Sequence, residues 1–336
     1  MPTIREVAQK AGVSPAAVSL VLNGKDCRLS ESTKRRIFRC ARELNYQPGK
    51  RHFPPASRSL PVIGILVPDI TNLFFADLCR SCQDEARKSG YQVILCSTDA
   101  FEESEYASID TFLKQKLDGI IFIHSSGLSE EKQEKICQRI CEAELPLVFI
   151  DVPKEYPDLS TVKTDHLHGS YLAVKYLLEL GHRRIGCLTG PQNQTRSAQL
   201  QGYKKALEEF QIPFSPELIY EGDYTLESGC QCLSSLLGQR ITAVFCFNDM
   251  MALGVYRSMR NYGLKIPEDL SIIGYDNIFI SEITDPPLTT VERRPQELGQ
   301  QAFALLFNAL QGKASPKNLT LSPTLKVRGS TARLVP

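Results

Sequence analysis

Two patterns of apolar residues divide the chain. Across the first 46 residues, apolar positions recur at the three- and four-residue spacing of amphipathic helices. From residue 62 onward, short apolar runs alternate with longer amphipathic segments, in two similar halves. The runs are VIGILVP (62–68), YQVILCS (91–97), GIIFIH (119–124), PLVFID (146–151), RIGCLTG (184–190), AVFCFND (243–249) and SIIGYDN (271–277). The pattern predicts a helical head and an α/β body of two doubly wound parallel sheets.

Local signals place three helices in the head. Thr3 stands three residues before a glutamate, the spacing of a capping box that starts a first helix. Gly12 can adopt the left-handed conformation that ends it, and Ser14 with Pro15 supplies the N-cap and first position of a second helix. A third helix is predicted after Ser30. Two short helices joined by a tight turn and followed by a third are typical of a helix-turn-helix DNA reader.

Charge separates the head from the body. Residues 1–60 hold 12 Lys and Arg against 4 Asp and Glu, which leaves 27 against 34 for the rest, so the head carries +8 and the body −7. A basic head predicts binding to a polyanion such as DNA. The alternative is a solvated basic face on a small helical module. Ala16, Ala17 and Ser19 favour the DNA interpretation, because small side chains let a helix approach base edges closely.

Polar and aromatic residues follow the predicted strands of the body. The polar ones are Asp69, Asn72, Asp151, Asn248 and Asp276, and the aromatic ones are Phe74, Phe75 and Tyr224. Open parallel sheets bind ligands at the carboxyl ends of their strands, and aromatic faces combined with amides and carboxylates are suited to a sugar. The alternatives are that a strand-end aspartate such as Asp249 is a helix N-cap and that the two phenylalanines are core residues.

Metal, redox and catalytic sites are the competing interpretations. Cys79 and Cys82 form a CxxC and His166 and His168 an HxH, but no matching pair stands at zinc-finger spacing, so we predict free buried thiols and no metal. The chain has no GxGxxG after a strand, no Walker loop and no GxSxG elbow, which predicts neither a cofactor nor an enzyme. A sugar-processing enzyme of similar α/β fold remains an alternative that the basic head argues against.

The N-terminus and the hydropathy bear on location. The start MPTIREVAQKAG lacks the apolar core of a signal peptide, and no apolar run approaches 18 residues. We therefore expect a cytosolic protein without a membrane partner. The second alternative, a secreted solute-binding protein, fits this start poorly.

The segment TIREVAQKAGVSPAAVSLVLNG, followed by ELNYQP, resembles the N-terminal signature of the LacI/GalR (lactose-repressor) family of bacterial transcription regulators. LQGYKKAL, GDYTLESG, FNDMMALGVY, IPEDLSIIGYDN and DPPLTTVERRPQELGQQA extend the resemblance over nearly the whole chain. It implies a DNA-binding domain at 1–48, a linker at 49–61, and a periplasmic-binding-protein-like effector domain with subdomains 62–162 plus 293–322 and 163–292 plus 323–336. The crossovers between subdomains are expected near 161–164, 291–294 and 321–325.

The resemblance implies a homodimeric repressor of carbohydrate uptake or utilisation genes, with a pseudo-palindromic double-stranded DNA operator and a sugar or sugar-derived effector. It leaves open a phosphorylated coregulator protein. The implied DNA-binding residues are Thr3, Ser14, Pro15, Ala16, Ala17, Ser19, Leu20, Asn23, Arg28, Thr33 and Tyr46. The implied effector contacts are Asn72, Phe74, Phe75, Asp151, Gln199, Tyr224, Asn248, Asp276 and Arg293.

Two residues depart from the family pattern. Gln199 stands where sugar- and purine-responsive members usually carry Arg, and Arg293 stands where many carry Gln. One hypothesis is that the effector bears a negative group near Arg293, as in a sugar phosphate or sugar acid. The alternative is that this arginine only pairs with an acidic neighbour, namely Glu292, Glu297 or Asp285.

The linker is the third departure. In the family this segment forms a hinge helix on DNA, and a Leu from it enters the minor groove. Here the corresponding position is Pro55, preceded by Pro54, and a proline inside a helix costs about 3 kcal/mol or more. We predict an extended linker, partly polyproline II, without the Leu wedge.

Overall fold

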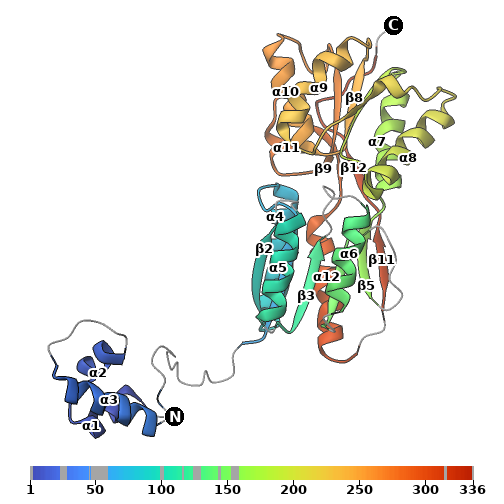
Figure 1. Cartoon of the computed structure of the whole chain (residues 1–336). Helices are drawn as coiled ribbons and strands as arrows, with labels where there is room; N and C mark the ends of the chain where they lie inside the picture. Colours follow the sequence, from blue (N-terminus) through green and yellow to red (C-terminus); the bar gives the residue numbers. More distant parts are fainter. Residues whose placement is uncertain are drawn as a thin grey trace. The chain divides into compact units, whose positions relative to one another are not determined.

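The computed structural model (Figure 1) describes residues 3–22, 29–44, 46, 60–98, 102–115, 117–123, 130–142, 145–152, 159–313 and 316–334. The chain falls into two compact units, the head within Met1–Ser59 and the body within Leu60–Pro336. The predicted extended linker and its two central prolines lie outside the described residues.

The head consists of three helices, α1 (Ile4–Ala11), α2 (Pro15–Leu22) and α3 (Glu31–Glu43). Both hydrogen bonds of the predicted capping box at Thr3 are present, and Gly12 ends α1 with φ 62° and ψ 40° in the left-handed region. Ser30 caps α3 by accepting a hydrogen bond from the Thr33 backbone N–H. The core of the head is made by Val7, Ala8, Ala11, Val18, Val21, Ile37, Cys40 and Ala41.

The body has two lobes, each built on a six-stranded sheet (Figure 1). The sheet of the first, the N-lobe, has the order β11-β5-β4-β3-β1-β2, and all its paired strands are parallel. Its strands are β1 (Val62–Val67), β2 (Gln92–Ser97), β3 (Gly119–Ile123), β4 (Leu147–Ile150), β5 (Ser160–Thr164) and β11 (Asn318–Leu321). Helices α4 (Leu73–Lys88) and α12 (Pro295–Leu310) pack together on it, and α5 (Glu102–Lys114) packs with α6 (Glu130–Cys141).

The second lobe, the C-lobe, has the strand order β12-β10-β9-β8-β6-β7, in which only β12 is antiparallel to its neighbour. Its strands are β6 (Ile185–Thr189), β7 (Ile219–Glu221), β8 (Ala243–Cys246), β9 (Ser271–Asp276), β10 (Thr289–Glu292) and β12 (Thr324–Lys326). Helix α7 (His166–Glu179) packs against α8 (Gln194–Glu209), and α9 (Leu226–Leu237) against α10 (Asp249–Asn261). Two short helices, η1 (Pro216–Leu218) and α11 (Ile280–Ile283), complete the lobe.

The chain passes between the lobes three times. It leaves β5 of the N-lobe for α7 of the C-lobe, returns from β10 to α12, and passes from β11 to β12. These passages follow Thr164, Glu292 and Leu321. Three crossovers therefore connect the two lobes, and a ligand between the lobes contacts both.

The seven predicted apolar runs all form strands, and six of them are almost wholly buried. The exception is β2, which lies at the sheet edge and exposes three of its side chains. Five further strands were not predicted, β5, β7, β10, β11 and β12, because each is short and mixes polar with apolar residues. Among the described helices, none combines the length and the apolar character that a membrane span requires.

Candidate functional site

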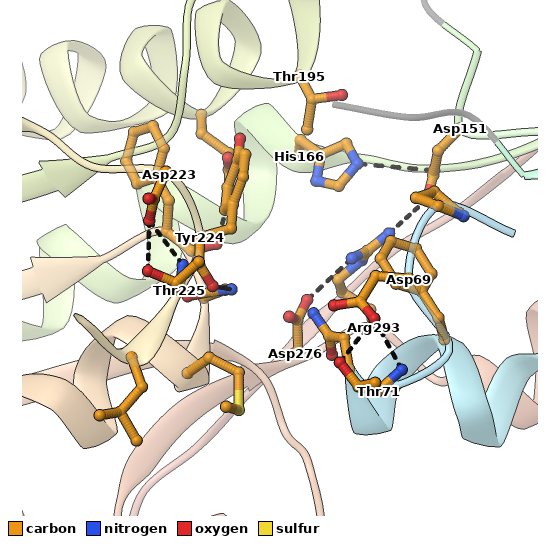
Figure 2. A pocket seen from close by; sticks show the side chains of 18 of the residues that line it. Asp69, Thr71, Asp151, His166, Thr195, Asp223, Tyr224, Thr225, Asp276 and Arg293 are labelled. Carbon is orange, nitrogen blue, oxygen red and sulfur yellow. Dashed lines mark hydrogen bonds and ion pairs between the residues drawn. The ribbon is translucent and has the colours of Figure 1, made fainter. Parts of the chain in front are cut away.

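A cavity of about 470 Å³ lies between the lobes (Figure 2). Asp69 and Asp151 reach it from the ends of β1 and β4 in the N-lobe, and Asn248 and Asp276 from the ends of β8 and β9 in the C-lobe. Its position at the carboxyl ends of both sheets is the one where open parallel sheets bind ligands. Its volume is within the ordinary range for small-molecule sites.

Arg293 bridges the lobes inside this cavity. One terminal nitrogen of its guanidinium donates to Asp151 of the N-lobe and the other donates to Asp276 of the C-lobe, over 2.8 Å (Figure 2). The guanidinium carbon lies 3.7 Å from the ring centroid of Phe74, an arrangement typical of a cation–π contact. All three charged side chains are at most 10% exposed. These contacts join the ends of β4 and β9 to the crossover between β10 and α12.

His166 extends the network. Its Nε2 lies 3.6 Å from an Asp151 carboxylate oxygen, and its Nδ1 lies 3.2 Å from the Tyr275 hydroxyl, on whose ring it stacks. In the sequence, His166 stands out only as part of the HxH pair that was weighed as a metal site. Its actual position follows from its place as the first residue of α7, directly after a crossover, where it faces the cavity.

The two carboxylates that hold Arg293 differ in their pKa values. Burial by itself raises the pKa of Asp151, but Arg293, His166 and the Thr164 backbone N–H hold it below its ordinary value. Burial raises the pKa of Asp276 above its ordinary value despite the same arginine. The two carboxylates therefore lie in different electrostatic environments although both bind the same arginine.

Three amide side chains line the cavity, and two of them also cap helices. Asn72 accepts a hydrogen bond from the Phe74 N–H at the start of α4, and Asn248 caps α10 and donates to the Tyr224 carbonyl over 2.9 Å. Gln199 is 2% exposed, and its amide nitrogen donates to the Phe247 carbonyl over 3.2 Å. Because the nitrogen must face that carbonyl, the buried Oε1 is left without a protein donor in the described chain and is available to a ligand.

Tyr224 supplies an aromatic wall. Its ring occupies the space beside Gly190, where a Cβ would come within 1.9 Å of the tyrosine Cζ. Asn193 lies close to its buried hydroxyl, and burial raises the pKa of this hydroxyl to about 12. The hydroxyl is therefore a neutral polar group in the cavity wall.

The backbone is strained around the cavity. Asp151, Tyr224, Asp276 and Arg294 have φ values of 55°, 68°, 111° and 54°, in the region that favours glycine. Strain of this kind persists where surrounding contacts impose it, and it is common at binding sites. Here it aims two carboxylates and an aromatic ring into one space.

Phe74 does not line the cavity as the implied effector contacts predict, and Arg293, which does line it, does not pair as the alternative predicts. Phe75 lines the cavity, but Phe74 is 1% exposed in the N-lobe core and contacts it only through Arg293, because successive residues of a helix point about 100° apart. Arg293 pairs with none of the three acidic neighbours proposed for it. Glu292 pairs with Lys326 and Glu297 with Arg294.

The N-terminus of α10 also differs from the alternative in which Asp249 is the N-cap. Its N-cap is Asn248, and Asp249 is the first helical residue, fully buried behind the cavity wall. Asp249 accepts hydrogen bonds from Thr290 Oγ1, Ser281 Oγ and the Ile278 N–H, at 2.6, 2.7 and 2.9 Å. Asp249 thereby holds the loop that follows Asp276.

The predicted DNA-reading side of α2 is open to solvent. Pro15, Ala16 and Leu20 are exposed, with Leu20 at 38%, while Ala17 and Ser19 are half-buried. Val18 and Val21 face the core from the opposite side of the helix. The exposed face is therefore small and apolar, as base-edge contact without side-chain hydrogen bonds requires.

The remaining predicted DNA contacts are placed around this helix. Ser14 accepts a hydrogen bond from the Ala17 N–H, and Thr33 lies 2.9 Å from the Ser30 hydroxyl at the start of α3. Tyr46 packs partly against the head core. Asn23 and Arg28 lie outside the described residues.

The described cysteines are free, and no group of three or more metal-ligating side chains occurs among the described residues. Cys79 and Cys82 are buried on α4, where burial raises the pKa of Cys79 to about 12. A thiol that stays protonated is a poor metal ligand and a poor nucleophile.

Comparisons with known proteins agree with this arrangement. Residues 3–49 match the model of bacterial regulatory proteins of the lacI family, and residues 174–331 match a periplasmic binding protein-like domain. The chain is 33% identical over 335 residues to the transcriptional regulator DegA of Bacillus subtilis, covering 99% of this chain and 98% of DegA. It is 36% identical over 342 residues to the transcriptional repressor CytR of Escherichia coli, covering 99% and 97%. Both relatives are named as transcriptional regulators rather than enzymes.

Solved structures show the same fold. The lac repressor dimer bound to operator and an anti-inducer superposes with a TM-score of 0.72 at 28% identity, covering 98% of this chain and 99% of that one. A regulator from Enterococcus faecium with bound ribose gives 0.73 at 35% identity, covering 82% and 100%. The chain therefore belongs to the LacI family of DNA-binding bacterial transcriptional regulators.

Proposed function

We propose that this regulator represses genes for carbohydrate uptake or utilisation, and that a sugar or sugar-derived effector in the interlobe cavity controls its affinity for DNA. The observation that carries the proposal is the cavity itself, which takes polar groups from both lobes at the carboxyl ends of the two sheets. A ligand held there contacts both lobes at once.

The available groups suit a polyhydroxylated ring. Phe75 and Tyr224 offer apolar faces, and Gln199 offers a buried acceptor. A buried acceptor without a donor is costly to leave unpaired, so a hydroxyl that reaches it gains affinity and specificity. The ribose-bound relative supports a ligand of this class in a cavity of this fold.

The charge of the cavity favours an uncharged effector. Its lining holds five carboxylates, Asp69, Asp151, Asp223, Glu227 and Asp276, against the single guanidinium of Arg293. That guanidinium is already paired on both sides. A sugar phosphate or sugar acid would meet excess negative charge, so the hypothesis of an anionic effector is replaced by a neutral one.

We also propose that the protein acts as a homodimer. Ile94 and Leu95, each 39% exposed, lie on the edge strand β2, and Phe279 and Ile283, each 65% exposed, lie at α11. Exposed apolar side chains on an edge strand and a short helix are typical of an interface. A twofold dimer presents two heads, which requires a pseudo-palindromic operator. The phosphorylated coregulator protein stays a prediction.

Control of DNA binding then follows from linkage. An effector changes operator affinity only if it binds the two arrangements of the lobes with different affinities. Because the chain crosses between the lobes three times, a change in their relative orientation is a hinge motion at those crossings. The same motion alters how the body presents the heads.

An operator titration tests the proposal. The full chain is titrated onto a DNA site selected from random sequence, with neutral pentoses, hexoses and disaccharides and with matched sugar phosphates. We expect at least one neutral sugar to change operator affinity by about tenfold, within the usual range of allosteric coupling. Failure to select any site would refute the regulator, and sugars without effect on a selected site would refute the proposed effector class.

A pair of variants links the response to the cavity. Gln199→Leu removes the buried acceptor and should weaken the response to the sugar about tenfold, while affinity for the operator without sugar stays unchanged. Gln300→Leu makes the same change on the exposed face of α12 and serves as the control. Equal responses from the two variants would contradict the assigned site.

A further inference from the structure

The Arg293 side chain joins the N-lobe to the C-lobe. Arg293 itself lies in the crossover from β10 to α12, Asp151 follows β4 of the N-lobe, and Asp276 ends β9 of the C-lobe. Its Nε lies 3.5 Å from the Thr164 hydroxyl, at the end of β5 where another crossover begins. We propose that Arg293 is an interlobe latch, which holds the two lobes closed on each other.

The geometry requires an arginine. A guanidinium is a planar fork that can donate to two carboxylates on opposite sides at once, whereas a lysine ammonium is a point charge on a flexible stem. The ring of Phe74 lies 3.7 Å from the guanidinium carbon and fixes the plane of the fork. Phe74 belongs to α4 of the N-lobe, so the latch is anchored in that lobe by packing as well as by charge.

Burial strengthens the attraction between Arg293 and the two carboxylates. The side chains of Arg293, Asp151 and Asp276 are 10%, 9% and 6% exposed, so solvent screens their attraction little. Without the cation, two buried carboxylates would face each other across the cavity. Removing one member of a buried ion pair leaves an uncompensated charge, and here that charge is relieved when the lobes separate and water enters.

The latch also gives a role to Arg293 and Gln199, the two residues that depart from the family pattern. Arg293 occupies the space between the two carboxylates, and Gln199 on α8 has an acceptor without a protein donor at the same cavity. A polar ligand must therefore enter a cavity in which Asp151 and Asp276 are already engaged. The inference rests on the proposed function only in treating this cavity as the effector site.

Hydrogen exchange of the full chain, without sugar or DNA, tests the latch. Arg293→Gln should raise the exchange rates of backbone amides in the segments 147–152, 160–166 and 271–278 about tenfold, because each segment contains a residue that lines the cavity, namely Asp151, His166 or Asp276. Segments of the C-lobe interior such as β6 should keep their rates. The control is Arg294→Gln, the neighbouring residue, whose side chain is 40% exposed and pairs only with Glu297 of α12.

Two further variants keep the test decisive if Arg293→Gln fails to fold. Arg293→Lys keeps the charge but not the fork, and Asp151→Asn breaks the N-lobe side without leaving an unpaired buried carboxylate. Both should open the same segments, by about threefold to tenfold. Wild-type exchange in these variants, or an equal effect of Arg294→Gln, would overturn the latch. Because neither sugar nor operator is present, that result would leave the proposed function standing, and a missing sugar response would leave the latch standing.

Discussion

Asp249 should make the stability of the body depend on pH, and Asp249→Asn should remove that dependence. The carboxyl is fully buried and accepts three hydrogen bonds, from Thr290, Ser281 and Ile278, with no cation among these partners. Burial, and then the nearby charge of Asp276, raises its pKa to about 7. An asparagine can keep the bonds from Ile278 and Ser281 through its oxygen and donate to Thr290 Oγ1 through its nitrogen.

The magnitude follows from the two pKa values. The native carboxyl holds its proton up to about pH 7, whereas the unfolded one releases it near pH 3.8. The free energy of unfolding is therefore highest below pH 4, falls as the pH rises from 4 to 7, and levels off above 7. Over the whole window the loss is about 4 kcal/mol, and about 2.5 kcal/mol of it falls between pH 5 and pH 8. For a body of this size that corresponds to about 5 °C in the unfolding midpoint.

Thermal unfolding of the wild type and of Asp249→Asn at pH 5, 6, 7 and 8 measures the effect. We expect the variant to be more stable than the wild type by about 1.5 kcal/mol at pH 5 and by about 4 kcal/mol at pH 8, because the unfolded carboxyl is already ionised at pH 5. The surface change Asp84→Asn, at a side chain 45% exposed on α4, corrects for general effects of charge removal. A constant difference between wild type and Asp249→Asn across this range would refute the reasoning.

Two other substitutions test the cavity wall and the dimer. Gly190→Ala places a methyl group 1.9 Å from the ring of Tyr224, so the ring must move, and we expect about tenfold weaker binding of the active sugar by calorimetry. Gly186→Ala, in the strand β6 that ends just before Gly190, meets only side-chain ends at 3.1 Å or more and should change sugar affinity little. Leu95→Glu should shift the sedimentation of the protein from dimer to monomer, whereas Phe214→Glu, a similarly exposed apolar position at 37%, should not; dimers in both would contradict the β2 interface.

Most of the fold is predictable because its strongest signals are local. The capping box at Thr3, the left-handed Gly12 and the Ser30 cap are short-range patterns, and the structure has all three. The buried central strands carry continuous apolar runs that no surface segment resembles. The strands that escaped prediction, such as β11, owe their existence to a partner far along the chain, in this case β5.

The candidate site is less predictable because it depends on directions in space. The strand ends predict Asp151 and Asp276 at one site and the family resemblance adds Arg293, and the structure places all three at the cavity. It does not reveal that they bind one another, since no pattern of spacing reports an ion pair between residues 142 positions apart. Nor does the sequence distinguish Phe74 from Phe75. On a helix, a shift of one residue decides whether a side chain faces the core or the cavity.

The three crossings between the lobes also constrain the order in which the body can be built. β5 of the N-lobe pairs with β11, whose residues lie 157 positions later, after almost the entire C-lobe. During synthesis, five of the six C-lobe strands are complete before the last N-lobe strand leaves the ribosome. The C-lobe can therefore form its core early, while the N-lobe sheet keeps an open edge at β5, where another chain can pair until β11 arrives. Assembly of the ligand cavity becomes a late step, and the nascent regulator is exposed to mispairing at that edge for longer than at any strand whose neighbours are close in sequence.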